Sequence, residues 1–131
     1  MVTDPISDLL IRLRNGFQRR HETITVPSSK LKRAILEILR QEGYLEAVED
    51  GVRDGHPVLN VRLRYVEDGQ PMISGLVRIS KPGRRVYVGS RDITKVRNGI
   101  GMSIVSTSRG VMTDQESRRH KLGGEVLCSV W

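Results

Sequence analysis

The C-terminal stretch Ile100 to Trp131 reads IGMSIVSTSRGVMTDQESRRHKLGGEVLCSVW and carries the clearest fold signals in the chain. Its first apolar run, Ile100 to Val105, and its last segment, Glu125 to Trp131, are typical of strands. Between them, Ser106 to Gly110 is rich in small hydroxyl side chains and predicts a loop. This part of the chain is therefore expected to be mainly β.

Two short helices are expected around these strands. Thr113 with Glu116 three residues later matches a capping box and predicts a helix of one to two turns. Gly123-Gly124 favours the end of that helix. Upstream, Arg91 to Arg97 predicts a second short helix.

A strand, a tight turn and a strand are expected before these elements. Met72 to Ser80 is strand-like, Lys81-Pro82-Gly83 predicts the turn, and Arg84 to Val88 predicts the returning strand. The polar, turn-rich segment Glu67 to Pro71 marks a boundary between lobes.

Helical periodicity dominates the start of the chain. Asp4-Pro5 predicts a helix start, and Asn15-Gly16 predicts its end. Thr23 to Val26 is expected to be extended. Ser28 or Ser29 can cap a second helix, which Gly43 stops.

Strand-like alternation follows. Tyr44 to Val48 and Val58 to Val66 predict an antiparallel ribbon, with Asp50-Gly51 as its turn. The fold class is therefore α/β in the broad sense (α+β), in two small lobes. Residues 1–70 are expected to form an N-terminal α/β lobe, and residues 71–131 a basic, mainly β lobe with short helices.

Composition and charge indicate a folded protein with polyanionic partners. The chain has 131 residues, of which 37% are hydrophobic, and this excludes a large multidomain enzyme and a disordered chain. Its 22 basic and 15 acidic residues give a net charge of +7. After Gln70 there are 11 basic and 4 acidic residues, against 11 of each before it, so the excess is C-terminal. Nucleic acid fits this balance best, although membranes and acidic proteins also bind basic surfaces.

Cysteine usage and hydropathy restrict the alternatives further. Cys128 is the only cysteine, so an internal disulfide is impossible, and alternation with Val126 and Val130 predicts a buried thiol. No signal-peptide pattern and no membrane-length apolar run occurs. We therefore expect a soluble cytoplasmic protein without structural zinc.

Catalytic and cofactor motifs are incomplete. Ser106 to Gly110 is not G-x-S-x-G, and the histidines His21, His56 and His120 fall in separate expected elements. Gly99-Ile100-Gly101 lacks the third glycine of a dinucleotide site. The sequence therefore predicts no enzyme, no catalytic residues, no metal and no cofactor.

The hydroxyl loop instead favours RNA. Short Ser and Thr side chains beside Arg109 and Gly110 can approach the 2′-hydroxyls of the wide, shallow RNA minor groove, although an ordinary turn explains the motif equally well. Aromatic residues are only 4% of the chain, which argues against a base-stacking platform. Lys81, Arg84 and Arg85 on a tight turn are expected to contact phosphates.

Several segments spread along the chain match a known family pattern: Asp4 to Leu10, Arg12 to Asn15, Val26 to Lys30, Glu42 to Tyr44, Arg78 to Tyr87, Gly99 to Gly101, Val105 to Asp114 and Gly123 to Val126. On these segments, the chain resembles the bacterial small-subunit ribosomal protein number eight family over essentially its whole length. The resemblance implies a primary binder of the central domain of 16S ribosomal RNA that aids platform assembly. It implies neighbouring small-subunit proteins as partners, and in many bacteria repression of the protein's own operon through its mRNA.

Site residues carried over from the family fall in both lobes. The resemblance implies a C-terminal RNA surface of Tyr87, Ser106, Thr107, Ser108, Gly110, Gly124 and Glu125, and flanking contacts from Thr3, Asp4, Arg14 and Lys30. Glu125 is expected to organise a base or a loop. Gln115-Glu116 departs from the more basic family pattern, which weakens any phosphate contact there.

Other classes of function are weaker. A regulator that acts only on mRNA should be scarce and should not sediment with small subunits, and an RNA-directed enzyme needs a catalytic constellation. DNA binding lacks a helix-turn-helix with a base-contacting helix. Membrane and DNA are therefore not expected as partners.

Overall fold

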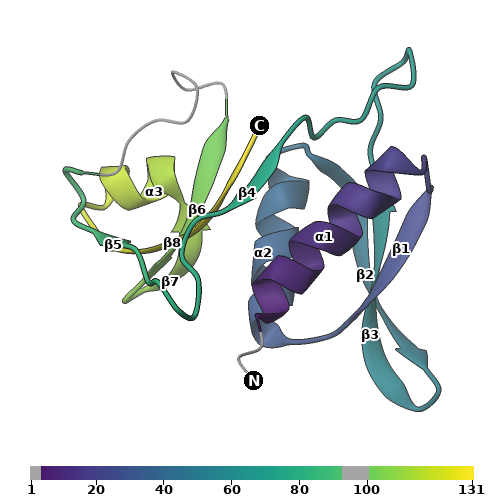
Figure 1. Cartoon of the computed structure of the whole chain (residues 1–131), viewed down its shortest axis with the longest axis horizontal. Helices are drawn as coiled ribbons and strands as arrows, with labels where there is room; N and C mark the ends of the chain where they lie inside the picture. Colours follow the sequence, from purple (N-terminus) through teal and green to yellow (C-terminus); the bar gives the residue numbers. More distant parts are fainter. Residues whose placement is uncertain (1–3, 93–100) are drawn as a thin grey trace. The chain divides into compact units, whose positions relative to one another are not determined.

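The structure, a computed structural model, describes residues 4–92 and 101–131 and divides into two compact units (Figure 1). One unit is Asp8–Ile73, and the other joins the start of the chain, up to Ser7, to Ser74–Trp131. Helices and antiparallel sheets are mixed, which confirms the expected α+β class. The lobe boundary drawn after residue 70 stays a prediction, and most of the helix expected at residues 91–97 lies outside the described residues.

The Asp8–Ile73 unit combines helices with a three-stranded sheet in the order β1-β3-β2. Its elements are α1 (Pro5–Gln18), which begins in the other unit, β1 (Thr23–Pro27), α2 (Lys30–Gln41), β2 (Leu45–Arg53) and β3 (His56–Leu63). The helices bury Leu9, Leu13, Ile35 and Leu39 completely, as their helical spacing predicts. Each such side chain contributes about 1.5–3 kcal/mol relative to exposure.

Helix α1 continues beyond its expected end at Asn15-Gly16. It runs to Gln18, because Phe17 still lies on the buried face, and Arg20 adopts the left-handed φ of 58° just beyond it. Gly16 is needed for packing, since a Cβ there would lie 2.7 Å from Ile24 Cγ2. Here the glycine allows close approach and does not end the helix.

The ribbon turns one Asp-Gly pair later than expected. Asp50 and Gly51 pair with Leu59 and Val58 inside the ladder, so the expected turn at Asp50-Gly51 is wrong. The turn is Asp54-Gly55, whose φ angles of 53° and 78° are those of a type I′ hairpin. The longer ladder pairs more backbone groups before the chain reverses.

The second unit contains a five-stranded sheet in the order β4-β8-β6-β7, with β5 also paired to β8. Its elements are β4 (Leu76–Arg78), β5 (Tyr87–Val88), β6 (Met102–Thr107), β7 (Gly110–Thr113), α3 (Asp114–Arg119) and β8 (Gly124–Val130). The two strands expected around the basic turn are shorter than predicted and do not pair with each other. Both pair with β8, as Figure 1 shows, so the intervening turn leaves and rejoins one edge of that strand.

The core of this sheet contains Ile104, Val105 and Cys128, all fully buried. The expected burial of the Cys128 thiol is confirmed, and this burial raises its pKa to about 12. The expected cap is also present, because Thr113 Oγ1 accepts a hydrogen bond from the Glu116 backbone N–H at 3.1 Å.

Candidate nucleic-acid interface

At one end of the sheet, residues that are far apart in the sequence pair across neighbouring strands and form two adjacent rows. Tyr87 of β5 pairs with Glu125 of β8, which pairs with Ser106 of β6. In the next row Gly124 pairs with Thr107, which pairs with Gly110 of β7. We call the set Tyr87, Ser106, Thr107, Ser108, Gly110, Gly124 and Glu125 the sheet-end surface.

The hydroxyl segment is a hairpin and not a five-residue loop. Ser106 and Thr107 belong to β6, and only Ser108 and Arg109 form the turn, which corrects the expected loop. Thr107 Oγ1 donates to the Gly110 carbonyl oxygen at 2.8 Å and accepts from the Arg109 N–H at 3.1 Å. Thr107 therefore fixes the turn from within, while Ser108 and Arg109 are exposed at its tip.

Gly124 is enclosed by the neighbouring strand. A Cβ at this position would lie 2.1 Å from the Ser106 carbonyl oxygen, closer than any real Cβ contact. At Gly123 a Cβ would lie 2.5 Å from the Val88 carbonyl oxygen. These two glycines allow β5, β8 and β6 to approach closely, so this end of the sheet presents backbone with little side-chain bulk.

Glu125 is held by protein donors. Its Oε2 accepts a hydrogen bond from the buried Ser80 hydroxyl and pairs with Arg85 Nη1 at 3.0 Å. Burial acts to raise the pKa of Glu125, but hydrogen bonds from Ser80 and Arg85, with the charges of Arg85 and Arg78, outweigh it and lower that pKa. The Glu125 carboxyl is therefore ionised at neutral pH, with its charge compensated inside the protein.

Ser80 is a supporting residue of the basic turn (Lys81 to Arg85) that sequence reasoning missed. Its hydroxyl also accepts the Val86 backbone N–H at 3.1 Å, so one side chain ties both ends of the basic turn to β8 through Glu125. A single serine before Lys-Pro-Gly carries no sequence signal for this role, because its partner lies 45 positions away.

The basic turn itself is narrow and exposed. Lys81 and Arg84 exchange two backbone hydrogen bonds of 3.0 and 2.9 Å, and both side chains are exposed. Within residues 4–92 and 101–131, neither side chain has a carboxylate partner, whereas Arg85 is paired with Glu125. Lys81 and Arg84 are thus available cations, whereas the charge of Arg85 is already compensated.

The remaining site residues have different positions. Asp4 stands at the start of α1, where its carboxylate accepts the Ser7 N–H at 3.2 Å and pairs with the nearly buried Arg78 at 3.2 Å. Burial acts to raise the pKa of Asp4, but the hydrogen bonds from Ser7 and Arg78 lower it overall. Arg14 and Lys30 are exposed in the Asp8–Ile73 unit, and Thr3 lies outside the described residues.

Known proteins resemble the chain over its full length. The family model described as "Ribosomal protein S8" matches residues 4–131. The chain belongs to the ribosomal protein S8 family. It is similar to the small ribosomal subunit protein uS8 of Opitutus terrae, at 53% identity over 131 residues that cover 99% of this chain and 100% of that protein. The uS8 of Levilactobacillus brevis is 52% identical over 130 residues, covering 99% and 98%.

Membership of the S8 family establishes the class of function. The chain is a structural protein of the small ribosomal subunit and not an enzyme, and the ribosome lies in the cytoplasm in bacteria. The family implies binding to 16S ribosomal RNA and to other ribosomal proteins. No group of three or more metal-binding side chains and no membrane-length apolar helix occurs in the described part of this S8 chain.

Proposed function

We propose that this S8-family chain is a primary binder of the central domain of 16S ribosomal RNA, where it aids assembly of the platform. The observation that supports this most strongly is the sheet-end surface. There, Gly124 and the hydroxyl side chains of Ser106 and Ser108 lie at strand ends that are fixed by backbone pairing.

The chemistry of this surface fits an RNA minor groove. Small residues allow backbone N–H and carbonyl groups to approach 2′-hydroxyls and base edges, and Ser108 at the hairpin tip can donate or accept. Tyr87 is 68% exposed at the edge of the surface, which leaves its ring free to pack against a sugar or a base. A rigid hairpin loses little conformational entropy on binding.

The basic turn supplies the electrostatic part of the proposal. Lys81 and Arg84 are exposed and lie outside any ion pair of the described residues, so we assign them to phosphate contacts, which position the protein without reading sequence. We assign Glu125 and Arg85 to holding the turn, because they bind each other. Arg109 at the hairpin tip is a third candidate for a phosphate contact.

Flanking contacts complete the proposal. Arg14 and Lys30 offer exposed cations on α1 and α2. The Asp4 carboxylate is occupied by Ser7 and Arg78, so we assign Asp4 to fixing the start of α1 beside any RNA contact. Repression of the protein's own operon, if its mRNA presents a helix of the same shape, would use the same sheet-end surface. The two RNAs would then compete for one protein molecule.

The proposal is tested by binding of the whole protein, across a salt series, to a central-domain 16S fragment and to an unrelated duplex of equal length. Specific binding should favour the fragment by about a thousandfold or more. Equal binding of both RNAs, with the same loss in salt, would overturn the proposal. Operon mRNA that displaces the fragment stoichiometrically would support the regulatory part, and simultaneous binding of both would contradict it.

A further inference from the structure

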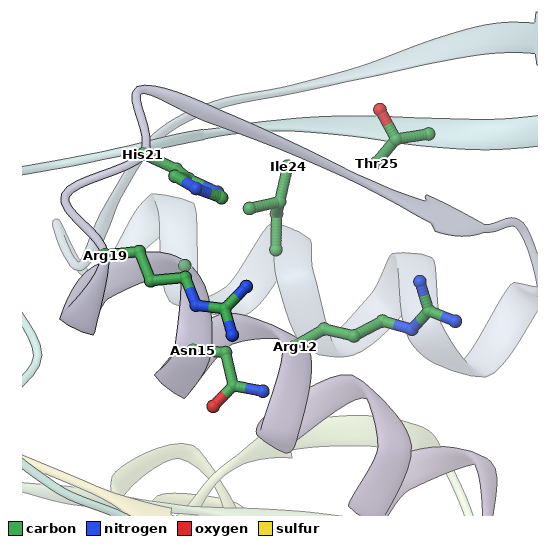
Figure 2. Close-up of a pocket in the computed structure, with 7 residues that line it drawn as sticks. Arg12, Asn15, Arg19, His21, Ile24 and Thr25 are labelled. Carbon is green, nitrogen blue, oxygen red and sulfur yellow. The ribbon is translucent and has the colours of Figure 1, made fainter.

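A hollow of about 280 Å³ lies wholly within the Asp8–Ile73 unit, which contains none of the residues of the sheet-end surface. Figure 2 shows α1 contributing side chains on successive turns and the segment after it contributing the rest. The lining residues are Arg12, Asn15, Gly16, Arg19, His21, Ile24 and Thr25. Most of these residues are polar or cationic, and none is a carboxylate.

Helical spacing explains why the cations face the same hollow. Arg12, Asn15 and Arg19 stand at i, i+3 and i+7 along α1, so they share one face of the helix. Leu13 and Phe17 are buried on another face, which fixes the rotation of the helix about its axis. Gly16 has no side chain, so Ile24 can pack close to the helix at this position.

The two cations of the hollow differ in how far they are already paired. Arg12 donates through Nε to Asp8 at 2.9 Å, and this ion pair leaves both of its Nη groups without a partner among the described residues. Arg19 is exposed and makes no ion pair with any residue that the structure describes. Two guanidinium groups and the Asn15 amide together supply N–H donors, which suit an anion. The Thr25 hydroxyl is already engaged, because it donates to Asn60 Oδ1 at 2.9 Å.

The net charge of the Asp8–Ile73 unit does not reveal the arginines of the hollow. Residues 8–73 contain 11 basic and 10 acidic side chains, a net charge of +1, so the unit looks neutral from its sequence. The fold places two arginines over one hollow without an acidic lining residue. Asp8 compensates the charge of Arg12, whereas Arg19 has no ion-pair partner among the described residues.

We propose that this hollow binds a phosphodiester group of the RNA backbone, as a contact separate from the sheet-end surface. The inference rests on the proposed function, because it takes RNA as the ligand. Guanidinium groups pair with phosphate oxygens in bidentate fashion, and the Asn15 amide can add a single hydrogen bond. The contact would add affinity without sequence preference.

The test compares two whole-chain variants, Arg19→Gln and Arg53→Gln, on the central-domain 16S fragment. Arg53 is the matched control, since it is an exposed arginine of the same unit at the end of β2, away from the hollow. Loss of one phosphate contact should reduce the slope of log K against log salt by about 0.7–0.9 and weaken binding about sixfold at 0.1 M salt. Arg19→Gln should show this loss and Arg53→Gln should not; equal slopes for the two variants would overturn the proposal.

A second readout places the ligand. The ring signals of His21, in the hollow, should shift in NMR spectra when the RNA is added, while those of His56 at the start of β3 should not. Inorganic phosphate at the same phosphate concentration should leave His21 unchanged. An equal shift of the His21 signals with inorganic phosphate would mean that the hollow is a site for small anions, and it would overturn the proposal.

The two proposals fail in different ways. If wild-type protein does not prefer the 16S fragment over the duplex, the proposed function fails. If it does prefer the fragment but Arg19→Gln behaves as Arg53→Gln, only the hollow loses its assignment.

Discussion

Alanine at Gly124 should disturb the sheet that carries the proposed RNA surface. Its Cβ would lie 2.1 Å from the Ser106 carbonyl oxygen, whereas Cβ contacts below 3.0 Å essentially never occur, so β6 and β8 must separate by roughly 1 Å or more. A backbone hydrogen bond of about 2.9 Å that lengthens by this amount is lost. One or two lost bonds with the accompanying strain should cost about 2–3 kcal/mol of folding free energy.

Urea unfolding of wild type and Gly124→Ala measures this cost directly, with Gly83→Ala as the control. A Cβ at Gly83 meets nothing within 4 Å and its φ is not positive, so this variant should stay within about 0.5 kcal/mol of wild type. The Gly124 variant should also bind the 16S fragment more weakly under conditions where it remains folded. If Gly124→Ala is as stable as Gly83→Ala, the close approach of β6 and β8 is wrong.

Two further substitutions test the electrostatics. Asp4→Asn keeps a side chain that can cap α1 but leaves the charge of the nearly buried Arg78 uncompensated, so it should cost about 1–2 kcal/mol at pH 7. Because the fold lowers the pKa of Asp4, the extra stability of wild type over Asp4→Asn is present above the ordinary value of 3.8 and is lost as pH falls below it. Urea unfolding at pH 7 and pH 3 should therefore show a smaller difference in free energy of unfolding at pH 3. The same difference at both pH values would contradict the assignment. In RNA binding, Arg84→Ala should reduce the salt slope by about 0.7–0.9 and Arg85→Ala by less than half as much, since Arg85 is paired with Glu125. A larger change for Arg85→Ala would reverse the roles of the two arginines.

Local chemistry made much of the fold predictable from the sequence. The Thr113 cap, the Ser29 cap of α2 and the buried faces of both long helices depend on residues three or four positions apart. The family resemblance was confirmed over residues 4–131 because its motifs are spread along the whole chain. Predictions from such short-range patterns hold in the folded protein because the interacting residues lie within one helix or strand.

The errors share a cause, which is competition between local and long-range pairing. Asp50-Gly51 and Asp54-Gly55 are equivalent turn signals, and only the ladder with β3 selects the second. Ser106 and Thr107 have a loop-like composition, yet pairing with β8 and β7 makes them strand. Gly16 resembles a helix end, but the close approach of Ile24 is what requires a glycine.

The candidate site was only partly visible for the same reason. Its small and basic residues could be named from motifs, but their partners could not. The pairing of Arg85 with Glu125 joins positions 40 apart, and it is the reason why we propose for Arg85 a role in supporting the turn, while its expected phosphate contact stays a prediction. Arg12 could be named from the sequence as a candidate phosphate contact on the first helix, but the hollow that it shares with Arg19 could not, because acidic residues elsewhere in the unit cancel the charge in the count.

The central claim is that the hydroxyl groups of Ser106 and Ser108, in the sheet-end surface, determine RNA specificity. It is tested most directly by the ratio of affinities for the 16S fragment and the unrelated duplex, in wild type and in the double variant Ser106→Ala, Ser108→Ala. The account predicts that this ratio is at least about tenfold lower in the double variant than in wild type, while the slope of log K against log salt is the same. An unchanged ratio would contradict the claim and move RNA recognition to another surface of the protein.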